Sequence, residues 1–453
     1  MGLSLGTALR LVPREGARAA DPSRLGVTVA FAGAGGKTTC MFSLARELAS
    51  PCLLTTTTHL GEWQLGQADR HIMAQTAHDL VQLGDSHVTV VTGPRNADGR
   101  MSAVSPETLD GLRRSSLANS WPLLIEADGA RQRPLKAAGP NEPQVPPFAE
   151  LVVVIAGMSG LGRQLDSQTV HRAERFAELS GLRLGERVTG QAILQVLGDG
   201  RGGLAGIPNR ARRLLVLNQA ETAQAQAVAS GLATSLLPTY DAVIVATAQT
   251  NHVHALHERS AGIVLAGGAA TRFGTPKQLL AWRGEPLVRV AALAAIRAGL
   301  APVIVVVGAH ADQVERAVSD LPLAVVWNTN WGEGQASSLR TGLNACPASI
   351  GSAVFLLADQ PLVTQEVIRA LVAAHATEAA AIVAPLIDEG RRGNPVLFDR
   401  ETFPALRDLR GDAGGRAIFA RHKVHYMPWH DVGISRDIDT PEDYRSLLKS
   451  DRA

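Results

Sequence analysis

Short apolar runs that stop at glycine are the main pattern along this chain. Residues 26–32 (GVTVAFA) run into the sequence GAGGKTT, and residues 261–266 (AGIVLA) run into GGAATR. After the first glycine loop, apolar side chains recur at helical spacing from Met41 to Leu48, which indicates an amphipathic helix. Each array therefore predicts a strand, a tight glycine loop and a helix, which is the start of a βαβ unit.

Further apolar runs of three to five residues continue this pattern in both halves of the chain. They are residues 53–56, 123–126, 151–155, 214–217, 242–245, 303–307, 324–327, 353–357 and 382–384. Helix-length segments such as 287–298 and 365–375 alternate with them. This alternation predicts an α/β fold with a doubly wound parallel sheet, formed twice.

A polar stretch, residues 251–260 (NHVHALHERS), divides the two arrays. We expect domains at residues 1–250 and 259–453, joined by this stretch as a solvated linker. It contains His252, His254 and His257, but no carboxylate or Cys stands beside them at the spacing of a metal site. The two glycine loops differ in sequence, so the chain is interpreted as a fusion of unlike domains.

Composition narrows the class of protein. A length of 453 residues fits two large or three average domains, and a net charge of +2 argues against a chain held to nucleic acid by bulk electrostatics. The isolated Cys40, Cys52 and Cys346 predict neither disulfides nor a Cys metal site. No apolar run approaches the ~18 residues of a membrane span, and no signal-peptide pattern opens the chain. We therefore expect a cytoplasmic protein without membrane or nucleic-acid partners.

The first glycine loop has the chemistry of a phosphate site. Backbone amides of the loop and of the following helix can bind phosphate, a lysine adds positive charge, and threonine hydroxyls reach the Mg²⁺ of a nucleotide. The loop is not a regular P-loop, because Phe31 stands where that pattern needs glycine. We expect ATP or GTP here; the alternative is a tight turn without a ligand. The predicted binding residues are Gly33, Gly35, Gly36, Lys37, Thr38 and Thr39.

A run ending in two carboxylates strengthens this interpretation. Residues 123–125 are apolar and lead into Glu126 and Asp128, at the sheet edge where an acid holds Mg²⁺ beside nucleotide phosphates. We predict both carboxylates as metal ligands. Arg131, Arg133 and Lys136 follow, either to pair with phosphate oxygens or as a solvated turn.

The second loop predicts activation of a nucleoside triphosphate. Residues 265–280 read LAGGAATRFGTPKQLL. The backbone of Leu265, Ala266, Gly267 and Gly268 is expected to contact nucleotide. Arg272 and Lys277 bring two cations to the β- and γ-phosphates, which stabilise a pyrophosphate leaving group. They are predicted as catalytic residues.

Carboxylates downstream suit a hard divalent cation. Asp359 ends an apolar strand and is predicted as a catalytic Mg²⁺ ligand, with Asp439 as a second ligand. A helix N-cap is the alternative for Asp359. Near Asp439, Thr440 is expected to cap a helix that has Pro441 at its first position, with Asp443 completing a capping box.

The first half of the chain resembles the YqeC-type family over roughly residues 1–245. The resemblance is carried by GAGGKTT, TTTTH (residues 55–59), EADGARQRPLKA (126–137) and VHRAERF (170–176). Members of this family are described as accessory proteins of selenium-dependent molybdenum hydroxylases. The resemblance implies a maturation pathway, with a hydroxylase apoenzyme as partner, more than it implies a reaction.

The second half, about residues 260–450, resembles the MobA-like nucleotidyltransferases, and within them the molybdenum cofactor cytidylyltransferases. The motifs are LAGG…R-F-G…K, ADQP, RRGNP and DIDTPED. The resemblance implies a Rossmann-like doubly wound sheet and transfer of CMP from CTP to the phosphate of molybdopterin-bound molybdenum. It also implies that the segment from Glu333 to Leu339 lines the cleft, with Gln335 and Ser337 binding nucleotide or pterin phosphate. LAGG is the form usual in guanylyltransferases, whereas cytidylyltransferases commonly have LAAG.

The sequence thus predicts a molybdenum cofactor cytidylyltransferase with Mg²⁺ as cofactor, fused to a nucleotide-binding accessory domain. A guanylyltransferase, or a transferase for another phosphorylated acceptor such as a sugar phosphate, is the alternative of the same class. A cofactor-carrying chaperone that binds nucleotide without turnover is the alternative of a different class.

Overall fold

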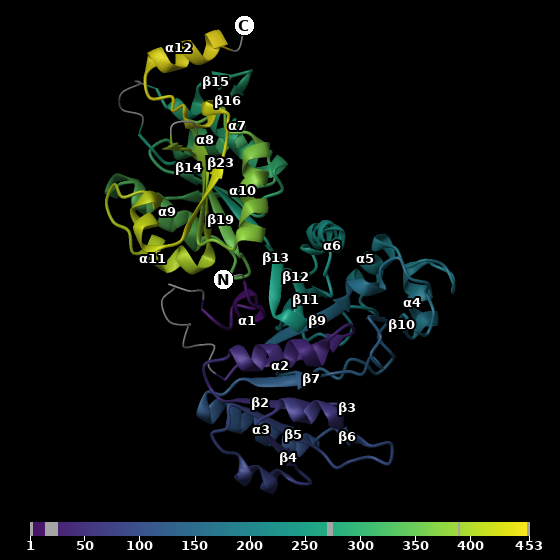
Figure 1. Ribbon diagram of the computed structural model, residues 1–453. Coiled ribbons are helices and arrows are strands. Elements are labelled where there is room, and N and C mark those ends of the chain that lie inside the picture. The colour runs from purple at the N-terminus through teal and green to yellow at the C-terminus, as the bar shows by residue number, and fades with distance from the viewer. Residues whose placement is uncertain (1–2, 14–25, 270–274, 388–389, 451–453) are drawn as a thin grey trace. The chain divides into compact units, whose positions relative to one another are not determined.

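A computed structural model describes residues 3–13, 26–269, 275–387 and 390–450, and the chain divides into two compact units, Met1–His257 and Glu258–Ala453. Each unit is an α/β structure built on one large sheet (Figure 1). No helix among the described residues is long and apolar enough to cross a membrane.

The first unit alternates short strands with helices. Its strands are β1 (Thr28–Gly33), β2 (Cys52–Thr56), β3 (His59–Gly61), β4 (Arg70–Met73), β5 (Val88–Thr92), β6 (Arg100–Ser102), β7 (Leu123–Glu126), β8 (Leu135–Lys136), β9 (Leu151–Gly157), β10 (Val170–His171), β11 (Arg212–Asn218), β12 (Ala242–Thr247) and β13 (His252–Glu258). Its helices are α1 (Leu5–Ala8), α2 (Lys37–Glu47), α3 (Pro106–Asn119), α4 (Ala173–Ser180), α5 (Gly190–Gly198) and α6 (Ala223–Leu236).

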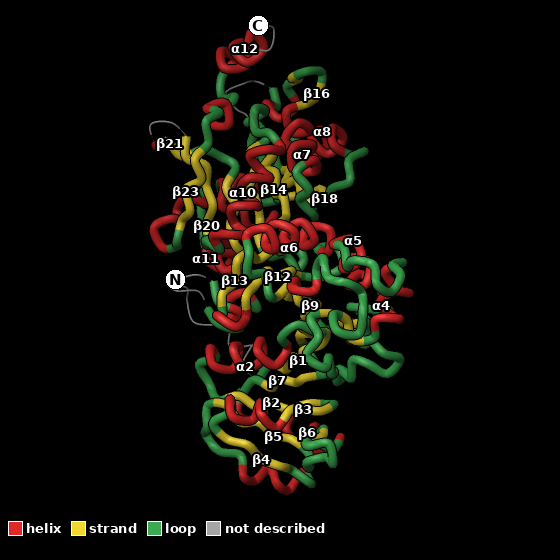
Figure 2. The backbone as a smooth tube through the Cα atoms, turned by 45° about the vertical axis from the view of Figure 1, so that its right-hand side comes forward, coloured by secondary structure: helices red, strands yellow, loops and turns green. Residues whose placement is uncertain are grey.

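Nine of these strands form one sheet in the order β13-β12-β11-β9-β1-β7-β2-β5-β4. Every pairing from β12 to β4 is parallel. The yellow strands β7, β2, β5 and β4 follow one another in Figure 2. Because the strands are parallel, the carboxyl ends of β1, β7 and β2 meet at one edge, where ligands of open α/β sheets bind.

Side chains alternate between the two faces of this sheet and bury both. Val29 and Phe31 of β1 pack with α1 and α2, while Ala30 packs with α4, α5 and α6 on the opposite face. The near-continuous apolar runs seen in the sequence are therefore strands covered on both faces, as parallel sheets require.

The second unit has the strands β14 (Ser260–Ala266), β15 (Ala281–Trp282), β16 (Glu285–Pro286), β17 (Val303–Val307), β18 (Ala324–Trp327), β19 (Ser352–Leu357), β20 (Ile382–Ile387), β21 (Arg391–Arg392), β22 (Val396–Asp399) and β23 (Val424–Pro428). Its helices are α7 (Leu287–Arg297), α8 (Ala311–Val318), α9 (Gln335–Asn344), α10 (Gln365–Glu378), α11 (Phe403–Arg407) and α12 (Pro441–Ser450).

The order of its sheet is β18-β17-β14-β19-β22-β20-β21, with β23 beside β20. The first four strands are parallel, so the order third, second, first, fourth is that of a Rossmann-like doubly wound sheet. β22 runs antiparallel to both β19 and β20, so the sheet is mixed. On β14, Ile263 packs on the face of α9 and Val264 on the face of α7 and α10.

Two local expectations have different outcomes. The linker expected at residues 251–260 is wrong, because residues 252–258 form β13 at the edge of the first sheet. Val253 and Ala255 alternate with the more exposed His252 and His254, as on a strand with one face buried. The capping box is confirmed: Asp443 N donates to Thr440 Oγ1 at 3.2 Å, and Thr440 N donates to Asp443 Oδ2 at 2.8 Å.

Gly33 is predicted to tolerate no side chain. Its φ is +95°, and an added Cβ would lie 2.2 Å from the Ile155 carbonyl oxygen. Gly33→Ala should lower the free energy of unfolding by about 2–4 kcal/mol, from the left-handed backbone and the overpacking together. Gly231→Ala is the matched control, because no atom lies within 4 Å of that added Cβ in α6, and alanine should stabilise the helix slightly. Calorimetry of the full chain measures both; equal transitions in the two variants would contradict this assignment.

Candidate functional site

The first glycine loop is packed tightly into its own unit. Gly33, Gly35 and Gly36 have φ values of +95°, +85° and +115°, and Gly36 is the residue before α2. The Gly33 amide donates to Asp128 Oδ2 at 3.0 Å, Ala34 N to Ile155 O at 2.8 Å, and Gly35 N to Arg133 O at 3.1 Å. Because these three amides already have acceptors, the backbone donors left for an anion are those of Gly36 and of the first turn of α2, which includes Thr38 and Thr39.

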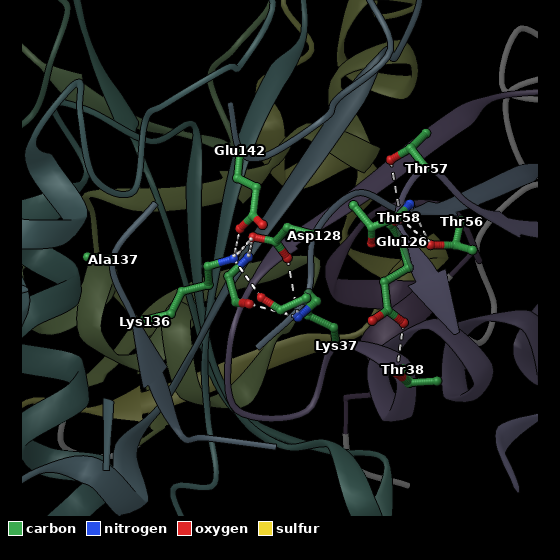
Figure 3. A network of polar contacts seen from close by, with 12 residues as sticks. Lys37, Thr38, Thr56, Thr57, Thr58, Glu126, Asp128, Lys136, Ala137 and Glu142 are labelled. Carbon is green, nitrogen blue, oxygen red and sulfur yellow. Dashed lines mark hydrogen bonds and ion pairs between the residues drawn. The ribbon is translucent and has the colours of Figure 1, made fainter. Parts of the chain in front are cut away.

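Lys37 is part of a buried ion network. Its Nζ donates to Gly33 O at 2.8 Å and lies 3.2 Å from Asp128 Oδ1. Lys136 lies 2.8 Å from the same carboxylate and 2.7 Å from Glu142 (Figure 3). Arg172 closes the chain of charges at 2.9 Å from Glu142. The side chains of Lys37 and Asp128 are only 4% and 2% exposed, so the network fixes the loop against β7 and β8.

Glu126 points away from this network toward α2. Thr38 Oγ1 donates to Glu126 Oε2 at 2.7 Å, and Gln64 Nε2 donates to Thr38 Oγ1 at 2.7 Å. Burial raises the pKa of Glu126, and Lys37 and the bond from Thr38 only partly oppose that rise. Glu126 and Thr38 therefore offer adjacent oxygen donors to a cation, whereas two ammonium groups hold Asp128. The two predicted metal ligands therefore have different environments. Glu126 bonds to Thr38, whereas Asp128 is paired with Lys37 and Lys136.

Other residues complete the loop, and no sequence signal links them to it. Asn218 Nδ2 donates to Gly35 O at 2.7 Å, and its Oδ1 accepts from Ala248 N at 2.8 Å. Glu142 lies 14 positions after Asp128 in the chain, and both carboxylates pair with Lys136. Partial burial alone would raise the pKa of Glu142, but the bonds from Arg172 and Lys136 outweigh burial and hold it at about 2.

The three basic residues after Asp128 have three different roles. Lys136 is buried in the ion network, and Arg133 Nε donates to Ser167 O at 2.7 Å. Arg131 instead lines a polar cavity of about 580 Å³. A phosphate partner stays a prediction for these residues, and Arg131 is the one of the three that lines the cavity.

In the second unit, Lys277 brings the predicted acidic residues together. Its Nζ lies 2.5 Å from Asp359 Oδ2 and 2.9 Å from Asp439 Oδ1. Asp359 follows β19, and its carbonyl accepts from Ile438 N at 3.1 Å, which ties the two acidic segments to each other. Burial would lower the pKa of Lys277, but Asp359 and Asp439 raise it above its ordinary value.

A third carboxylate, that of Asp437, lies near Asp359 and Asp439. Gln360 Nε2 donates to Asp437 Oδ1 at 2.6 Å, and burial together with Asp359 and Asp439 raises the pKa of Asp437. The sequence pattern included Asp437 in DIDTPED but did not single it out. Within the described part of the chain, no group of three or more His, Cys, Asp or Glu side chains is arranged to hold a metal. Asp359 and Asp439 still converge on one cationic atom, so they fit a Mg²⁺ that takes its other ligands from phosphates and water.

The second glycine loop approaches its neighbours closely. An added Cβ on Gly267 would lie 3.2 Å from Ser338 Oγ, and one on Gly308 would lie 2.5 Å from Gly267 O. Buried Gln278 donates to Ala266 O at 3.2 Å and to Gly268 O at 2.7 Å, while Leu265 O accepts from Ala358 N at 3.2 Å. Arg272 lies outside the described residues.

The two polar residues inferred from the family segment differ in environment. Gln335 opens α9 and is exposed, whereas Ser337 is buried. Ser337 Oγ accepts from Asn328 Nδ2 at 2.8 Å and donates to Gly334 O at 2.8 Å. The structure therefore leaves Gln335 accessible at a helix N-terminus and engages Ser337 in holding the turn before α9.

The comparisons with known proteins agree with this division. Residues 262–426 match the MobA-like NTP transferase domain, and residues 29–174 match the YqeC protein family. The chain belongs to the MobA-like NTP transferase family through its second unit and carries a YqeC domain in its first. The C-terminal unit is thus a nucleotidyltransferase domain, as the sequence motifs indicate.

The relatives differ in the activity that they are named for. A nicotine blue oxidoreductase of Paenarthrobacter nicotinovorans is 33% identical over 41% of this chain and 95% of its own length. The uncharacterized protein YqeC of Escherichia coli is 29% identical over 44% of this chain and 79% of its own. A probable molybdenum cofactor guanylyltransferase of Bacillus cereus is 28% identical over 42% of this chain and 96% of its own.

Solved structures similar to part of the chain include Rv0371c of Mycobacterium tuberculosis, once in complex with manganese. That complex is 30% identical and covers 42% of this chain and 99% of its own, with a TM-score of 0.38. A molybdopterin-guanine dinucleotide biosynthesis protein A of Archaeoglobus fulgidus is 19% identical over 42% of this chain and 98% of its own, with a TM-score of 0.35.

The buried network predicts a pH dependence of stability. The folded pKa of Glu142, about 2, is below its ordinary 4.5, so its contribution is full above about pH 4.5 and is lost as the pH falls toward 2. Glu142→Gln should lower the free energy of unfolding at pH 7 by about 1–2 kcal/mol, allowing for partial solvent screening. Denaturant unfolding at pH 7 and pH 3 measures the difference. A destabilisation of the same size at both pH values would show that the charge is not its cause.

Proposed function

We propose that the C-terminal unit transfers CMP from CTP to the terminal phosphate of molybdopterin-bound molybdenum, with release of pyrophosphate. The observation that carries this proposal is the position of Lys277, between Asp359 and Asp439 at the carboxyl edge of the sheet. An ammonium group and two carboxylates at one point are the groups needed to receive a triphosphate together with its divalent cation. The membership in the MobA-like family supports the same reaction class.

The proposed step needs positioning rather than proton removal. An oxygen of the pterin phosphate, already anionic at neutral pH, attacks the α-phosphorus of CTP. The bond from that phosphorus to the bridging oxygen of the β-phosphate breaks, and pyrophosphate leaves with the electron pair. Lys277 would leave its carboxylates for the departing phosphates, so its charge follows the charge that develops in the transition state.

Mg²⁺ bound by Asp359 and Asp439 would neutralise charge on the triphosphate. The two carboxylates are suited to this role because both already contact one cationic atom. When Lys277 turns to the phosphates, these oxygens need a replacement cation, since carboxylates at this spacing repel each other. Release of Lys277 and retention of the divalent cation are therefore coupled in this proposal.

The N-terminal unit is proposed to bind ATP or GTP at the first turn of α2, and to assist delivery of the cofactor to a molybdenum hydroxylase apoenzyme. The support is the Thr38–Glu126 pair beside the first-turn amides and the match to the YqeC family. Fusion to the transferase would keep the product at a high effective concentration near the unit that uses it.

Pyrophosphate release by the purified full chain tests both the proposed reaction and the choice of nucleobase. We expect release with CTP only when molybdenum cofactor is added, and slower release with GTP. Faster release with GTP than with CTP would mean that the enzyme is a guanylyltransferase. Absence of release with either nucleotide would reject a transferase, and it would leave a nucleotide-binding chaperone or an activity of the kind named for the oxidoreductase relative.

Asp359→Asn is expected to reduce turnover by at least about 100-fold, because it removes a charge that faces the reacting phosphates. Asp408→Asn in the same unit is the matched control, since Asp408 is an exposed residue at the end of α11. Unfolding curves of the two variants should coincide. An Asp359→Asn enzyme that keeps full turnover with Mg²⁺ would exclude the assigned role.

Lys277→Ala is expected to raise the KM for the nucleotide and lower kcat, each by about 10-fold, with little change in binding of the pterin substrate. Lys423→Ala, an exposed lysine before β23, controls for loss of net charge. Equal weakening of nucleotide and pterin binding by Lys277→Ala would contradict the placement of Lys277 at the leaving group.

A further inference from the structure

The polar cavity that Arg131 lines lies at the edge of the first sheet that also carries the glycine loop. It has a volume of about 580 Å³, within the range of small-ligand sites. Thr57 and Thr58, which follow β2, line it together with Gly129, which follows β7. None of the described residues that line it belongs to the glycine loop. In the sheet, β7 lies between β1, which leads into the glycine loop, and β2, which leads to Thr57 and Thr58.

The lining of this cavity is positively charged. Arg100, Arg131 and Arg172 line it, and Glu142 is the carboxylate among its described lining residues. Glu142 is already neutralised by Arg172 at 2.9 Å and by buried Lys136 at 2.7 Å. The guanidinium groups of Arg100 and Arg131 make no hydrogen bond or ion pair to any residue that the structure describes, and both residues are exposed. Two guanidinium groups thus line the cavity without an ion-pair partner among the described residues.

Neighbouring arginines outside the cavity do have partners. Arg133, two positions from Arg131, donates to Ser167 O at 2.7 Å. Arg95, five positions before Arg100, pairs with Glu62 at 2.8 Å. The arginines near the cavity therefore either have a partner outside it or face into it.

The backbone holds two of the cavity arginines in an unfavourable conformation. Arg131 has φ +48° and Arg172 has φ +64°, which costs about 1–2 kcal/mol for a residue with a side chain. Gly139 gives Arg172 its room, because an added Cβ there would lie 2.9 Å from the guanidinium carbon. Strained residues of this kind persist where the surrounding structure requires their placement, often at ligand sites.

The field in the cavity also acts on His171, which lines it. Burial lowers the pKa of His171, and the charges of Arg172, Lys136 and Arg131 add to this effect against the opposing effect of Glu142, so that the pKa is about 4. The ring is therefore neutral at pH 7, and the cavity repels a further proton. An anion that neutralised the arginines would raise this pKa, so His171 is a reporter of occupancy.

The chemistry of the lining indicates the kind of ligand. Guanidinium groups bind phosphate and carboxylate oxygens in pairs, and several of them together match a multiply charged anion. No Phe, Tyr or Trp is among the described lining residues, so no aromatic face is available to stack on a nucleobase. We propose that this cavity binds a small phosphate ester or diphosphate through Arg100, Arg131 and Arg172, as an anion site separate from the glycine loop. This proposal is independent of the reaction proposed for the C-terminal unit.

Histidine-selective NMR of the full chain tests the proposal without an activity assay. His59 and His171 both line the cavity, and His59→Gln and His171→Gln assign their ring signals. The probes are inorganic phosphate and pyrophosphate, each compared with sodium chloride at the same ionic strength, because salt screens exposed charges. We expect a saturable shift of the His171 signal and a rise of its pKa above about 4.

Two variants separate the cavity from other anion sites on the chain. Arg131→Gln should raise the half-saturating probe concentration by about 10-fold or more, which is the loss of one charge-assisted contact. Arg133→Gln, which removes a charge from the same loop but not from the cavity, should leave it unchanged. His254 of the same unit, whose Nε2 lies 2.9 Å from Thr247 Oγ1, reports that both variants are folded. A His171 signal that neither probe shifts, or that shifts equally in the two variants, would overturn the proposal.

Discussion

The buried pairing of Asp128 with two lysines is the interaction on which the first unit depends. A carboxylate whose side chain is 2% exposed is tolerated only when opposite charges and hydrogen bonds replace its water. Lys37, Lys136 and the Gly33 amide supply them. Because these groups come from α2, β8 and the glycine loop, the requirement to neutralise one side chain fixes the relative positions of all three. Glu142 and Arg172 then balance the second lysine, which extends the constraint to the cavity.

The second unit also pairs a lysine with an aspartate, Lys277 with Asp359, but this pair is more exposed than Lys37 with Asp128. Lys277 and Asp359 are 21% and 17% exposed, and Asp439 is 53% exposed. Breaking an exposed pair costs little, whereas breaking a buried pair leaves a charge without solvent. Lys277 can therefore exchange its carboxylates for phosphates at moderate cost, but Lys37 cannot leave Asp128 as readily. The difference in burial thus favours exchange of partners for Lys277 and a fixed partner for Lys37.

The sequence predicts the strands and helices of this architecture well. It predicts poorly which residues distant in the chain come into contact. Apolar runs ending at glycine place β1 and β14, and the Thr440 cap follows from local hydrogen-bonding chemistry. β13 was missed because its histidines were weighed as polar residues, whereas their alternation with Val253 and Ala255 is a strand pattern. Asn218 and Glu142 were missed for another reason. Their partners are distant in the chain, and no periodicity encodes which strand ends meet.

Phe31 explains why the first glycine loop is a poor phosphate cradle by itself. Where a regular P-loop has its first glycine, this side chain is fully buried against α2, so β1 continues to Gly33 and the loop is short. A short loop directs its amides into the protein, toward Ile155, Arg133 and Asp128. Fewer backbone donors remain for an anion, and the fixed cations of the adjacent cavity are the compensating source of positive charge at this edge. For the anion proposed to bind in that cavity, arginine side chains rather than backbone amides would supply most of the contacts, so its affinity is expected to depend more on ionic strength than that of an amide-lined site.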